Sequence, residues 1–275
     1  PVIMGHEVAG VVTEIGQGVT SCRLGDLVTC ETYFSVCEKC EYCRAGLPNM
    51  CRSRKSIGSG VHGAFTRYVL VPERNVHQLP PNVDEWAGAL TEPLTCCVHA
   101  LERTRVEPGD AVVVSGPGAI GLLMAQVVKA AGGRVILLGT TADEARLRMG
   151  EQLGVDCAVN VQTANAQEIV AAMTDGLGAD VVFECAGAQA SAQNCLNLVR
   201  RRGRYMQVGL FGKAVQWDLD QVCFKELQVA GSFAHLPSAW RKALTLMASG
   251  QVQTKPLIST ILPISEWQQA FDIFE

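Results

Sequence analysis

The chain of 275 residues is 48% hydrophobic and 18% charged and carries a formal net charge of −4. It is long enough for two domains with buried cores, and without basic runs it shows no feature of a protein that binds nucleic acid or an anionic membrane. No apolar run reaches the roughly 18 residues that span a membrane, and the first residues lack a signal-peptide pattern. The twelve cysteines then predict a reducing compartment and a cytoplasmic protein.

Short β-branched segments bounded by glycines characterise residues 1–96. Segments 8–12 and 26–28 are predicted strands, and the alternating segment 64–71 predicts another. Many short strands separated by glycine and proline are typical of β-barrels. We therefore expect a β-rich, partly open barrel in this part of the chain.

Four cysteines within this part follow the spacing C-x2-C-x2-C-x7-C: Cys37, Cys40, Cys43 and Cys51. The residues between them are too polar for a core strand. Thiolates at such intervals can enclose one tetrahedral Zn²⁺ within a single loop. Because four cysteines leave no ligand position open, this zinc would be structural. The alternative is that the cysteines are free or paired in disulfides.

Strands and helices alternate from residue 97 to residue 236. Strands are predicted at 111–114, 134–138, 180–183, 204–208 and 227–230, and helices at 120–131 and 144–153. This alternation predicts a parallel sheet with right-handed crossovers. Residues 237–275 contain two helical stretches around a short strand at 257–262 and are expected to return to the first domain. The predicted domain ranges are therefore 1–96, 97–236 and 237–275.

A G-x-G-x-x-G pattern directly follows the first of these strands and opens a helix, which is the context of a dinucleotide-binding turn. The first glycine permits the tight turn, the second lets a pyrophosphate approach the backbone, and the third lets helix and strand pack closely. The helix N-terminus would offer its N–H groups to the phosphates. The alternative is a glycine-rich turn without a ligand. The residues are Gly116, Pro117, Gly118, Ala119, Ile120 and Gly121.

Gly139 and Thr140 follow the next strand, where enzymes that use NAD place an acidic residue for the ribose diol. The absence of a carboxylate at this point removes a repulsion of the 2′-phosphate of NADP, and Arg146 is positioned to reach that phosphate. The sequence therefore favours NADP over NAD. Two alternatives remain: Arg146 is a solvated helix residue, or Asp143 or Glu144 binds the diol of NAD.

His6 and Glu7 precede the first predicted strand, and an imidazole beside a carboxylate can ligate and tune a metal ion. Together with the GHEVAG segment at 5–10, the cysteine run, the glycine turn and the EPL segment at 92–94, they make the chain resemble the zinc-containing medium-chain alcohol dehydrogenase family over essentially its whole length. Ethanol-oxidising members have a cysteine where Glu92 stands. The glutamate resembles the sorbitol and threonine dehydrogenase branch, although it would also suit the first turn of a helix.

The resemblance implies an α/β fold: a Rossmann-type doubly wound parallel sheet plus a β-rich, GroES-like partly open barrel domain. It implies that His6, Glu7 and Glu92 surround a catalytic zinc in the cleft between the domains. It also implies that the backbone of two late strand ends meets the nicotinamide of NADP or NAD. These two segments consist of Val208, Gly209 and Leu210, and of Gly231, Ser232 and Phe233.

The activity implied is oxidation of a secondary alcohol, such as a polyol or a threonine-like substrate, by hydride transfer to nicotinamide. Zinc would lower the pKa of the substrate hydroxyl, and the cofactor would accept the hydride. The expected partners are a small-molecule alcohol and further copies of the chain in a dimer or tetramer, with no nucleic acid and no membrane.

The family's first zinc ligand is a cysteine well before the Gly-His-Glu element, followed closely by a serine or threonine of the proton relay. Because the chain starts five residues before His6, we expect that segment to be absent and the chain to bind nearer one zinc than two. An alternative function is a catalytically incompetent fragment that binds nucleotide and zinc. A zinc-free quinone reductase relative would not need these ligands. His62, His99 and His235 are expected to be structural or peripheral.

Overall fold

The computed structural model describes residues 1–274. The chain forms two compact units, and it passes between them more than once. The first unit contains Pro1–Glu92, Leu236–Ala248 and the segment from Thr254 onward, and the second contains Pro93–His235 and Ser249–Gln253. The domain ranges 1–96, 97–236 and 237–275 that we expect from the sequence remain predictions.

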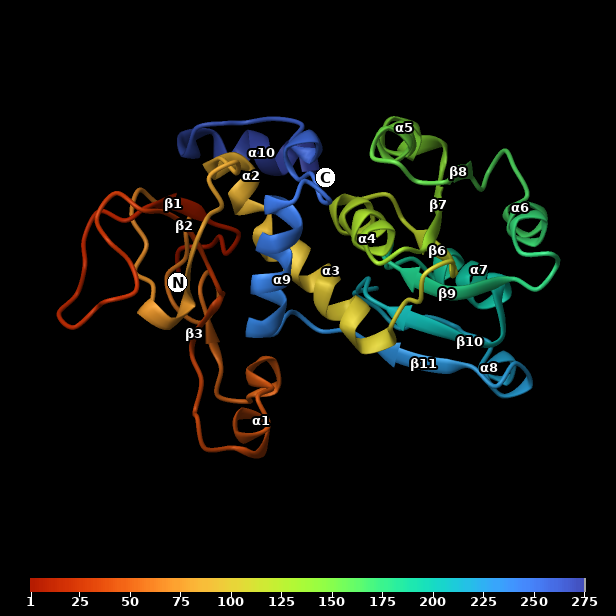
Figure 1. Ribbon diagram of the computed structural model, residues 1–275, viewed down its shortest axis with the longest axis horizontal. Coiled ribbons are helices and arrows are strands. Elements are labelled where there is room, and N and C mark those ends of the chain that lie inside the picture. Colours follow the sequence, from red (N-terminus) through yellow and green to blue (C-terminus); the bar gives the residue numbers. More distant parts are fainter. Residues whose placement is uncertain (275) are drawn as a thin grey trace. The chain divides into compact units, whose positions relative to one another are not determined.

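The second unit is built on a six-stranded sheet in which all neighbouring strands are parallel. The strand order β11-β10-β9-β6-β7-β8 is the 3-2-1-4-5-6 order of dinucleotide-binding sheets when the strands are renumbered within the unit. The strands are β6 (Ala111–Ser115), β7 (Arg134–Gly139), β8 (Cys157–Asn160), β9 (Ala179–Glu184), β10 (Val199–Gln207) and β11 (Gln228–Gly231). The predicted Rossmann-type sheet is confirmed (Figure 1).

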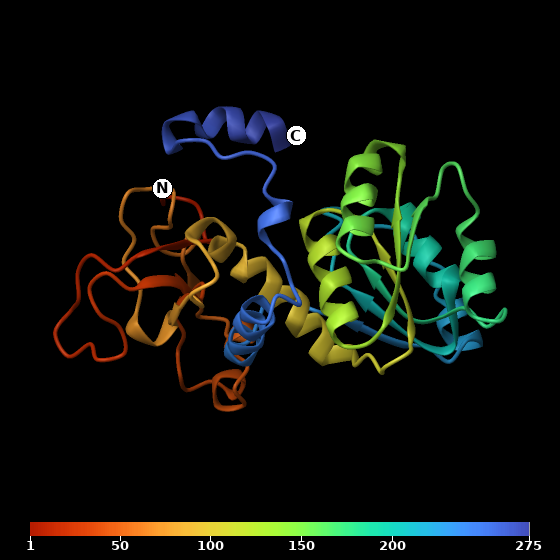
Figure 2. The ribbon, with the colours of Figure 1, turned by 45° about the horizontal axis from the view of Figure 1, so that its top comes forward.

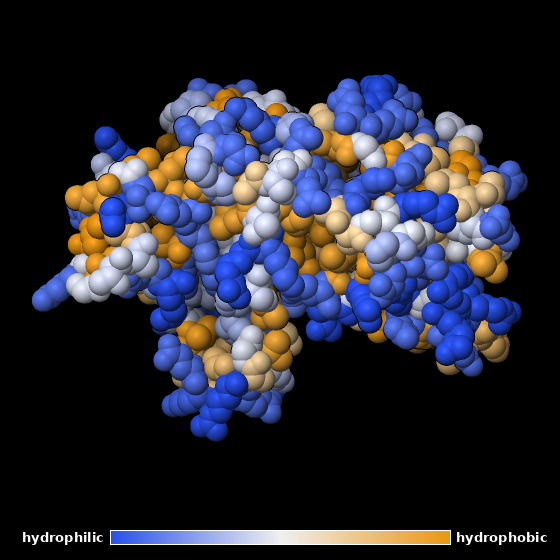
Figure 3. Space-filling view, in the orientation of Figure 1, coloured by the Kyte–Doolittle hydropathy of each residue, from blue (hydrophilic) through white to orange (hydrophobic). Residues whose placement is uncertain are grey.

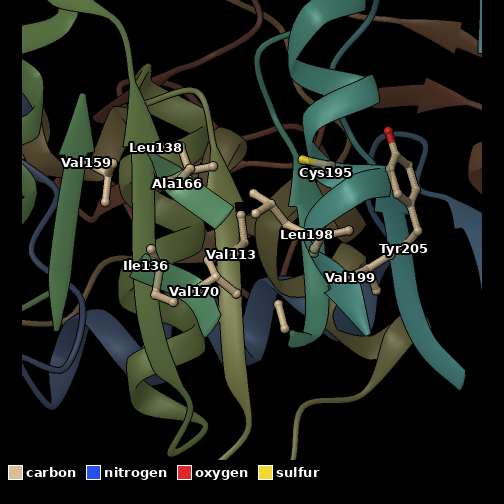
Figure 4. Packing of buried hydrophobic residues seen from close by; sticks show 12 residues of the cluster. Val113, Ile136, Leu138, Val159, Ala166, Val170, Cys195, Leu198, Val199 and Tyr205 are labelled. Atoms are coloured by element: carbon tan, nitrogen blue, oxygen red, sulfur yellow. The ribbon is translucent and has the colours of Figure 1, made fainter. Parts of the chain in front are cut away.

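Helices cover both faces of this sheet (Figure 1, Figure 2). On one face, apolar side chains of β6–β10 form a continuous core with α6 and α7, and on the other face α4 and α5 contact β6 and β7 (Figure 4). Strand β6 is buried throughout, as expected for a central strand covered on both sides. The helices are α3 (Thr91–Thr104), α4 (Ala119–Ala130), α5 (Glu144–Gln152), α6 (Ala166–Met173), α7 (Gln189–Leu198) and α8 (Asp220–Phe224).

The first unit is rich in short antiparallel strands. A three-stranded sheet has the order β1-β2-β5, and β3 pairs separately with β4. The strands are β1 (Ala9–Val11), β2 (Leu27–Cys30), β3 (Tyr33–Ser35), β4 (Lys55–Ser56) and β5 (Val76–Gln78). The helices are α1 (Glu41–Arg44), α2 (Glu85–Ala89), α9 (Pro237–Ala248) and α10 (Trp267–Phe274), with 3-10 turns at Pro48–Met50, Glu73–Asn75, Lys255–Leu257 and Ile264–Glu266.

Two predicted strands are wrong. Residues 64–71 do not form a ladder; only the backbone N–H groups of residues 63–65 bond to residues 3–5, and the side chains beyond them are mostly exposed. Residues 257–262 follow a 3-10 turn that contains Pro256 and have no strand partner. Alternation of side chains predicts a strand only where a neighbour offers its backbone, and the sequence does not show that neighbour.

The surface of both units carries large exposed apolar side chains among hydrophilic ones (Figure 3). In the second unit these include Leu210, Leu219, Phe224 and Val229. Within residues 1–274, no helix combines the length and the apolar character needed to cross a membrane.

Candidate metal centres and cofactor site

The four cysteines of the spaced run form one cluster. Their sulfurs, from Cys37, Cys40, Cys43 and Cys51, all lie within 4.8 Å of one another. Cys37 Sγ and Cys43 Sγ are 3.9 Å apart, which matches the separation of about 3.8 Å between two sulfurs that bind one tetrahedral zinc at about 2.3 Å. All twelve cysteines are free thiols, so the disulfide alternative gains no support. The cluster fits a structural zinc.

Backbone N–H groups point at the sulfurs of this cluster. Cys40 N donates to Cys37 Sγ over 3.4 Å, and Cys43 N donates to Cys40 Sγ over 3.5 Å. The N–H groups of Lys39 and Cys40 lower the pKa of Cys37 to about 6. Burial and the neighbouring thiols raise the pKa of Cys43 to about 12. Neighbouring thiols therefore shift the pKa values of Cys37 and Cys43 in opposite directions. A bound cation would favour the thiolate form of its ligands.

His6, Glu7 and Glu92 form a second group, with one ligand atom of each within 4.8 Å of the others. His6 and Glu7 are exposed and lie before β1, whereas Glu92 lies in the first turn of α3 and is only 7% exposed. An imidazole and two carboxylates are suitable zinc ligands, and three protein ligands leave a position for water or substrate. The donor set therefore fits a catalytic zinc.

Glycines fix the backbone that carries His6. Gly5 has φ +91°, and a Cβ on Gly58 would lie 2.6 Å from the carbonyl oxygen of Gly5. A Cβ on Gly63 would overlap the same oxygen. The backbones of residues 5, 58 and 63 therefore touch, and hydrogen bonds from residues 63–65 to residues 3–5 hold the segment in place. Only glycine permits this close approach.

The two carboxylates of the second group disfavour each other's charge. Burial raises the pKa of Glu92 to about 8, and repulsion from Glu7 adds to the shift. Burial of its carboxylate also raises the pKa of Glu7, although the residue as a whole is exposed, and nearby His6 opposes that shift. A cation bound between the carboxylates would offset both effects.

The glycine turn joins β6 to α4. Gly116 has φ +98°, and its Cβ would meet Ala186, while a Cβ on Gly121 would overlap the carbonyl oxygen of Gly116. Gly118 differs, because it has φ −70° as the N-cap of α4 and no atom of the chain lies within 4 Å of its missing Cβ. Glycine is accepted at an N-cap, although a serine, threonine, asparagine or aspartate would add a capping hydrogen bond. The open space beside Gly118 fits a phosphate that approaches the backbone.

The turn after β7 is held by its own hydrogen bonds. Gly139 is buried, and its Cβ would come within 2.8 Å of Pro117, so glycine here has a steric cause whatever the cofactor. Asp143 accepts hydrogen bonds from Thr140 N and Thr140 Oγ1 at 3.0 and 2.8 Å, and Arg146 pairs with it at 3.1 Å. Burial opposes ionisation of Asp143, but these bonds lower its pKa. Asp143 is thus engaged locally, while the Arg146 side chain is 63% exposed.

Segments 208–210 and 231–233 both follow the C-terminal ends of adjacent parallel strands, β10 and β11. The N–H groups of Val208 and Gly209 donate to the carbonyl of Glu184, and Ser232 N donates to that of Gln207. The glycine turn follows β6 of the same sheet. All three segments therefore lie at the edge where open α/β sheets bind ligands.

The sequence analysis missed Glu184. This residue ends β9 and is fully buried, and its carboxylate accepts hydrogen bonds from Ala186, Gly187, Ser191 and Gln207. A signal was present, because an acidic residue directly follows the apolar run of a central strand.

The remaining histidines lie outside both metal groups. His62 Nδ1 accepts a hydrogen bond of 3.0 Å from Ile3 N, next to the segment that carries His6. His99 is 4% exposed, and its Nδ1 has no hydrogen-bond partner among the described residues. Burial, with a contribution from Arg103, lowers the pKa of His99. His235 is fully buried in the second unit.

The chain matches known protein families over most of its length. Residues 119–249 match the zinc-binding dehydrogenase family, and residues 1–81 match the alcohol dehydrogenase GroES-like domain. The chain belongs to the family of zinc-binding alcohol dehydrogenases. It is an oxidoreductase that uses zinc and a nicotinamide cofactor, as the resemblance implied, with the predicted Rossmann-type sheet and GroES-like domain.

Among curated proteins, the chain is 43% identical to a sorbitol dehydrogenase of Halalkalibacterium halodurans over 98% of the chain and 79% of that protein. It is 38% identical to a D-arabitol-phosphate dehydrogenase of Enterococcus avium over 99% of the chain and 78% of that protein.

Among solved structures, L-idonate 5-dehydrogenase of Escherichia coli matches with a TM-score of 0.90 and 29% identity, over 99% of this chain and 78% of that one. A second match is a protein of Sinorhizobium meliloti that is described as a zinc-binding dehydrogenase and is bound to NADP. Its TM-score is 0.86 and its identity 32%, over 94% of this chain and 76% of that chain. These likenesses cover both units.

Replacing Cys40 with serine should remove the tightly bound zinc from the cysteine cluster, because one of four thiolates is lost and Cys40 also caps α1. Zinc released by a thiol reagent should fall by one equivalent per chain, and the melting temperature should fall too. Cys223→Ser, at an exposed thiol, is the matched control and should change neither quantity. Retention of a tight zinc in Cys40→Ser would overturn the assignment.

Replacing Gly118 with valine should weaken dinucleotide binding at least tenfold, about 1.4 kcal/mol. An added Cβ at this position meets no atom of the chain within 4 Å, so we attribute the loss to the space that the pyrophosphate needs. Fluorescence titration gives the affinity, and an unchanged melting temperature shows that the fold is intact. Unchanged affinity in a folded variant would show that the phosphates lie elsewhere.

Proposed function

We propose that the protein oxidises a secondary hydroxyl of an open-chain polyol, with His6, Glu7 and Glu92 around the catalytic zinc. The observation that carries this proposal is the convergence of these three side chains from segments far apart in the sequence. The polyol is supported by the relatives named sorbitol and D-arabitol-phosphate dehydrogenase. Cys37, Cys40, Cys43 and Cys51 would hold the structural zinc.

Each group of residues has a separate part in the reaction. His6 and Glu92 would hold the zinc while Glu7 lies close enough to enter its coordination shell. A zinc held there would lower the pKa of the substrate hydroxyl, and a bound nicotinamide would accept the hydride. The turn at 116–121 would bind the pyrophosphate, and segments 208–210 and 231–233 would line the nicotinamide. The protein's contribution is to bind and orient the two reactants.

The cofactor choice rests on the turn after β7. We propose NADP, because no carboxylate stands at Gly139 or Thr140 and the exposed Arg146 can turn toward a 2′-phosphate. In the alternative with NAD, Glu144 is the better candidate for the diol, since Asp143 is already bonded to Thr140 and Arg146.

We also propose that the protein is cytoplasmic and assembles as a dimer or tetramer. Its twelve free thiols support a reducing compartment. Strand β11 ends the sheet, its side chains are largely exposed, and Phe224 and Val229 add exposed apolar surface nearby. An uncovered strand edge with apolar neighbours favours association with another copy. Sedimentation of the purified protein measures the assembly directly.

Replacing Glu92 with glutamine should abolish sorbitol-dependent reduction of the cofactor. In a zinc titration the wild type should bind two equivalents per chain. The variant should lose the equivalent that binds with the lower affinity. The weaker class is expected at His6, Glu7 and Glu92, because a set of one imidazole and two carboxylates binds zinc less tightly than four thiolates. Glu85→Gln, on the neighbouring helix α2, is the matched control and should keep both zincs and full activity.

The fold should tolerate Glu92→Gln. In the metal-free protein the raised pKa of Glu92 means that the folded state holds a proton that the unfolded state has released, between pH values near 4.5 and 8. Stability contributed by this residue therefore falls as the pH rises through that range. Glutamine resembles the protonated form, so the metal-free variant should melt no lower than the wild type at pH 8. A folded Glu92→Gln protein with full activity and two zincs would contradict the site.

Replacing Arg146 with alanine should raise the KM for NADP about tenfold and leave the KM for NAD unchanged. The loss of about 1.4 kcal/mol would be that of one charge-assisted contact to a phosphate. Arg148→Ala removes a similarly exposed arginine of α5 and should change neither KM. A wild-type protein that strongly prefers NAD would contradict the proposed role of Arg146.

A further inference from the structure

The second unit contains one fully buried carboxylate at the ligand-binding edge of its sheet. Glu184 ends β9 with no exposed surface. Its Oε1 accepts hydrogen bonds from Ala186 N at 3.0 Å, Gly187 N at 3.1 Å and Ser191 Oγ at 2.6 Å. Its Oε2 accepts from Gln207 Nε2 at 2.6 Å and from Gly187 N at 3.1 Å. No lysine, arginine or histidine of the described residues pairs with it, so all of its hydrogen-bond donors are neutral groups.

The carboxylate connects the ends of three strands. Gln207 ends β10, and its Nε2 also donates to the carbonyl of Gly209 at 2.8 Å. Ser191 Oγ lies 2.8 Å from the Oγ of Ser115, which ends β6 and precedes the glycine turn. The backbone carbonyl of Glu184 accepts from Val208 N and Gly209 N. One residue therefore holds the loops that follow β9 and β10 and reaches the end of β6.

These loops pack on each other through their backbones. A Cβ on Gly209 would lie 2.8 Å from Glu184 Oε2, and it would overlap the backbone nitrogen of Gly187. Gly187 has φ +63°, and a Cβ on it would overlap the carbonyl oxygen of Leu210. Segment 208–210 thus rests directly on the carboxylate and on the loop that the carboxylate organises. Any change in the hydrogen bonds of Glu184 must move this backbone.

We propose that Glu184 is a positioning residue for the nicotinamide half of the cofactor site. The inference rests on the proposed function, in which segment 208–210 lines the nicotinamide. Glu184 is fully buried beneath Gly209 and acts through the backbone above it. The adenosine and pyrophosphate half depends on residues 116–121 and on the turn after β7, and no hydrogen bond joins Glu184 to either. Gly116 packs on Ala186, whose N–H donates to Glu184, so the influence of Glu184 on the pyrophosphate turn is indirect.

Glu184→Gln tests the inference with little change in shape. With three donors directed at Oε1, the amide oxygen takes that position, and the amide nitrogen faces one further donor, Gln207 Nε2, as well as Gly187 N, which is shared between the two positions. Gln207 must then rotate and release the carbonyl of Gly209. We expect the Kd for the oxidised dinucleotide to rise at least tenfold. The Kd for the matching ADP-ribose fragment, which lacks nicotinamide, should change less than twofold.

Glu226→Gln is the matched control, since Glu226 lies in the same unit with its side chain 76% exposed, and it should change neither Kd. Gln207→Met removes the hydrogen bond to the carbonyl of Gly209 while keeping the carboxylate of Glu184. It should likewise raise the Kd for the dinucleotide and leave the Kd for the fragment nearly unchanged. The double variant should bind the dinucleotide with a Kd no higher than that of the weaker-binding single variant. Both changes act through the same hydrogen bond, from Gln207 to the carbonyl of Gly209, so their effects should not add.

Equal weakening of dinucleotide and fragment, or no weakening of either, would overturn the role of Glu184 and leave the proposed function intact. Failure of the wild-type protein to bind both ligands would instead contradict the proposed function. If Glu184→Gln does not fold, the titration of Gln207→Met decides. A raised Kd for the dinucleotide with an unchanged Kd for the fragment supports the positioning role, and any other result overturns it.

Discussion

The burial of Glu92 beside a second carboxylate, that of Glu7, is the constraint on which the functional account depends. A folded chain does not bring two carboxylates and an imidazole within 4.8 Å of one another without cost, because burial disfavours the charged form of Glu92 and repulsion from Glu7 adds to the penalty. A divalent cation turns this arrangement into an attractive one. The first unit is therefore built around a group of side chains that is most favourable when a metal is bound.

Close backbone packing is what makes this arrangement rigid. Because Gly5, Gly58 and Gly63 have no side chains, three stretches of backbone touch next to the segment that carries His6. The second unit uses the same device at Gly187 and Gly209, over the buried carboxylate of Glu184. In both units glycines bring loops close enough for hydrogen bonds to fix them, and the side chains that would contact zinc or cofactor project from these fixed loops.

The sequence predicted those features that depend on local spacing. The cysteine run and the G-x-G-x-x-G turn carry their geometry in a few consecutive residues, and the buried strands of the parallel sheet are continuous apolar runs. The convergence of His6 with Glu92 came from the family resemblance, since no local pattern joins residues so far apart. The match to a zinc-binding family favours this reading over a zinc-free relative.

Features that depend on tertiary packing could not be predicted from the sequence. The strand predicted at 64–71 alternates correctly, but only Ala64 and Phe65 donate backbone hydrogen bonds, to Gly5 and Met4. Glycine at 139 was interpreted as a sign of the cofactor, and the structure adds a steric cause that the sequence does not show, because a Cβ there would lie 2.8 Å from Pro117 and 3.1 Å from Leu147. Glu184 was missed because two of its partners, Ser191 of α7 and Gln207 of β10, come next to it only in the folded sheet.

A crystal structure with anomalous scattering measured at the zinc edge tests the central claim most directly. With zinc supplied in excess, the account predicts two anomalous peaks. One should lie at about 2.3 Å from the four cysteine sulfurs, and the other at about 2.0–2.2 Å from a nitrogen of His6 and a carboxylate oxygen of Glu92. A single peak at the cysteines, with His6 and Glu92 directed away from each other, would contradict the account.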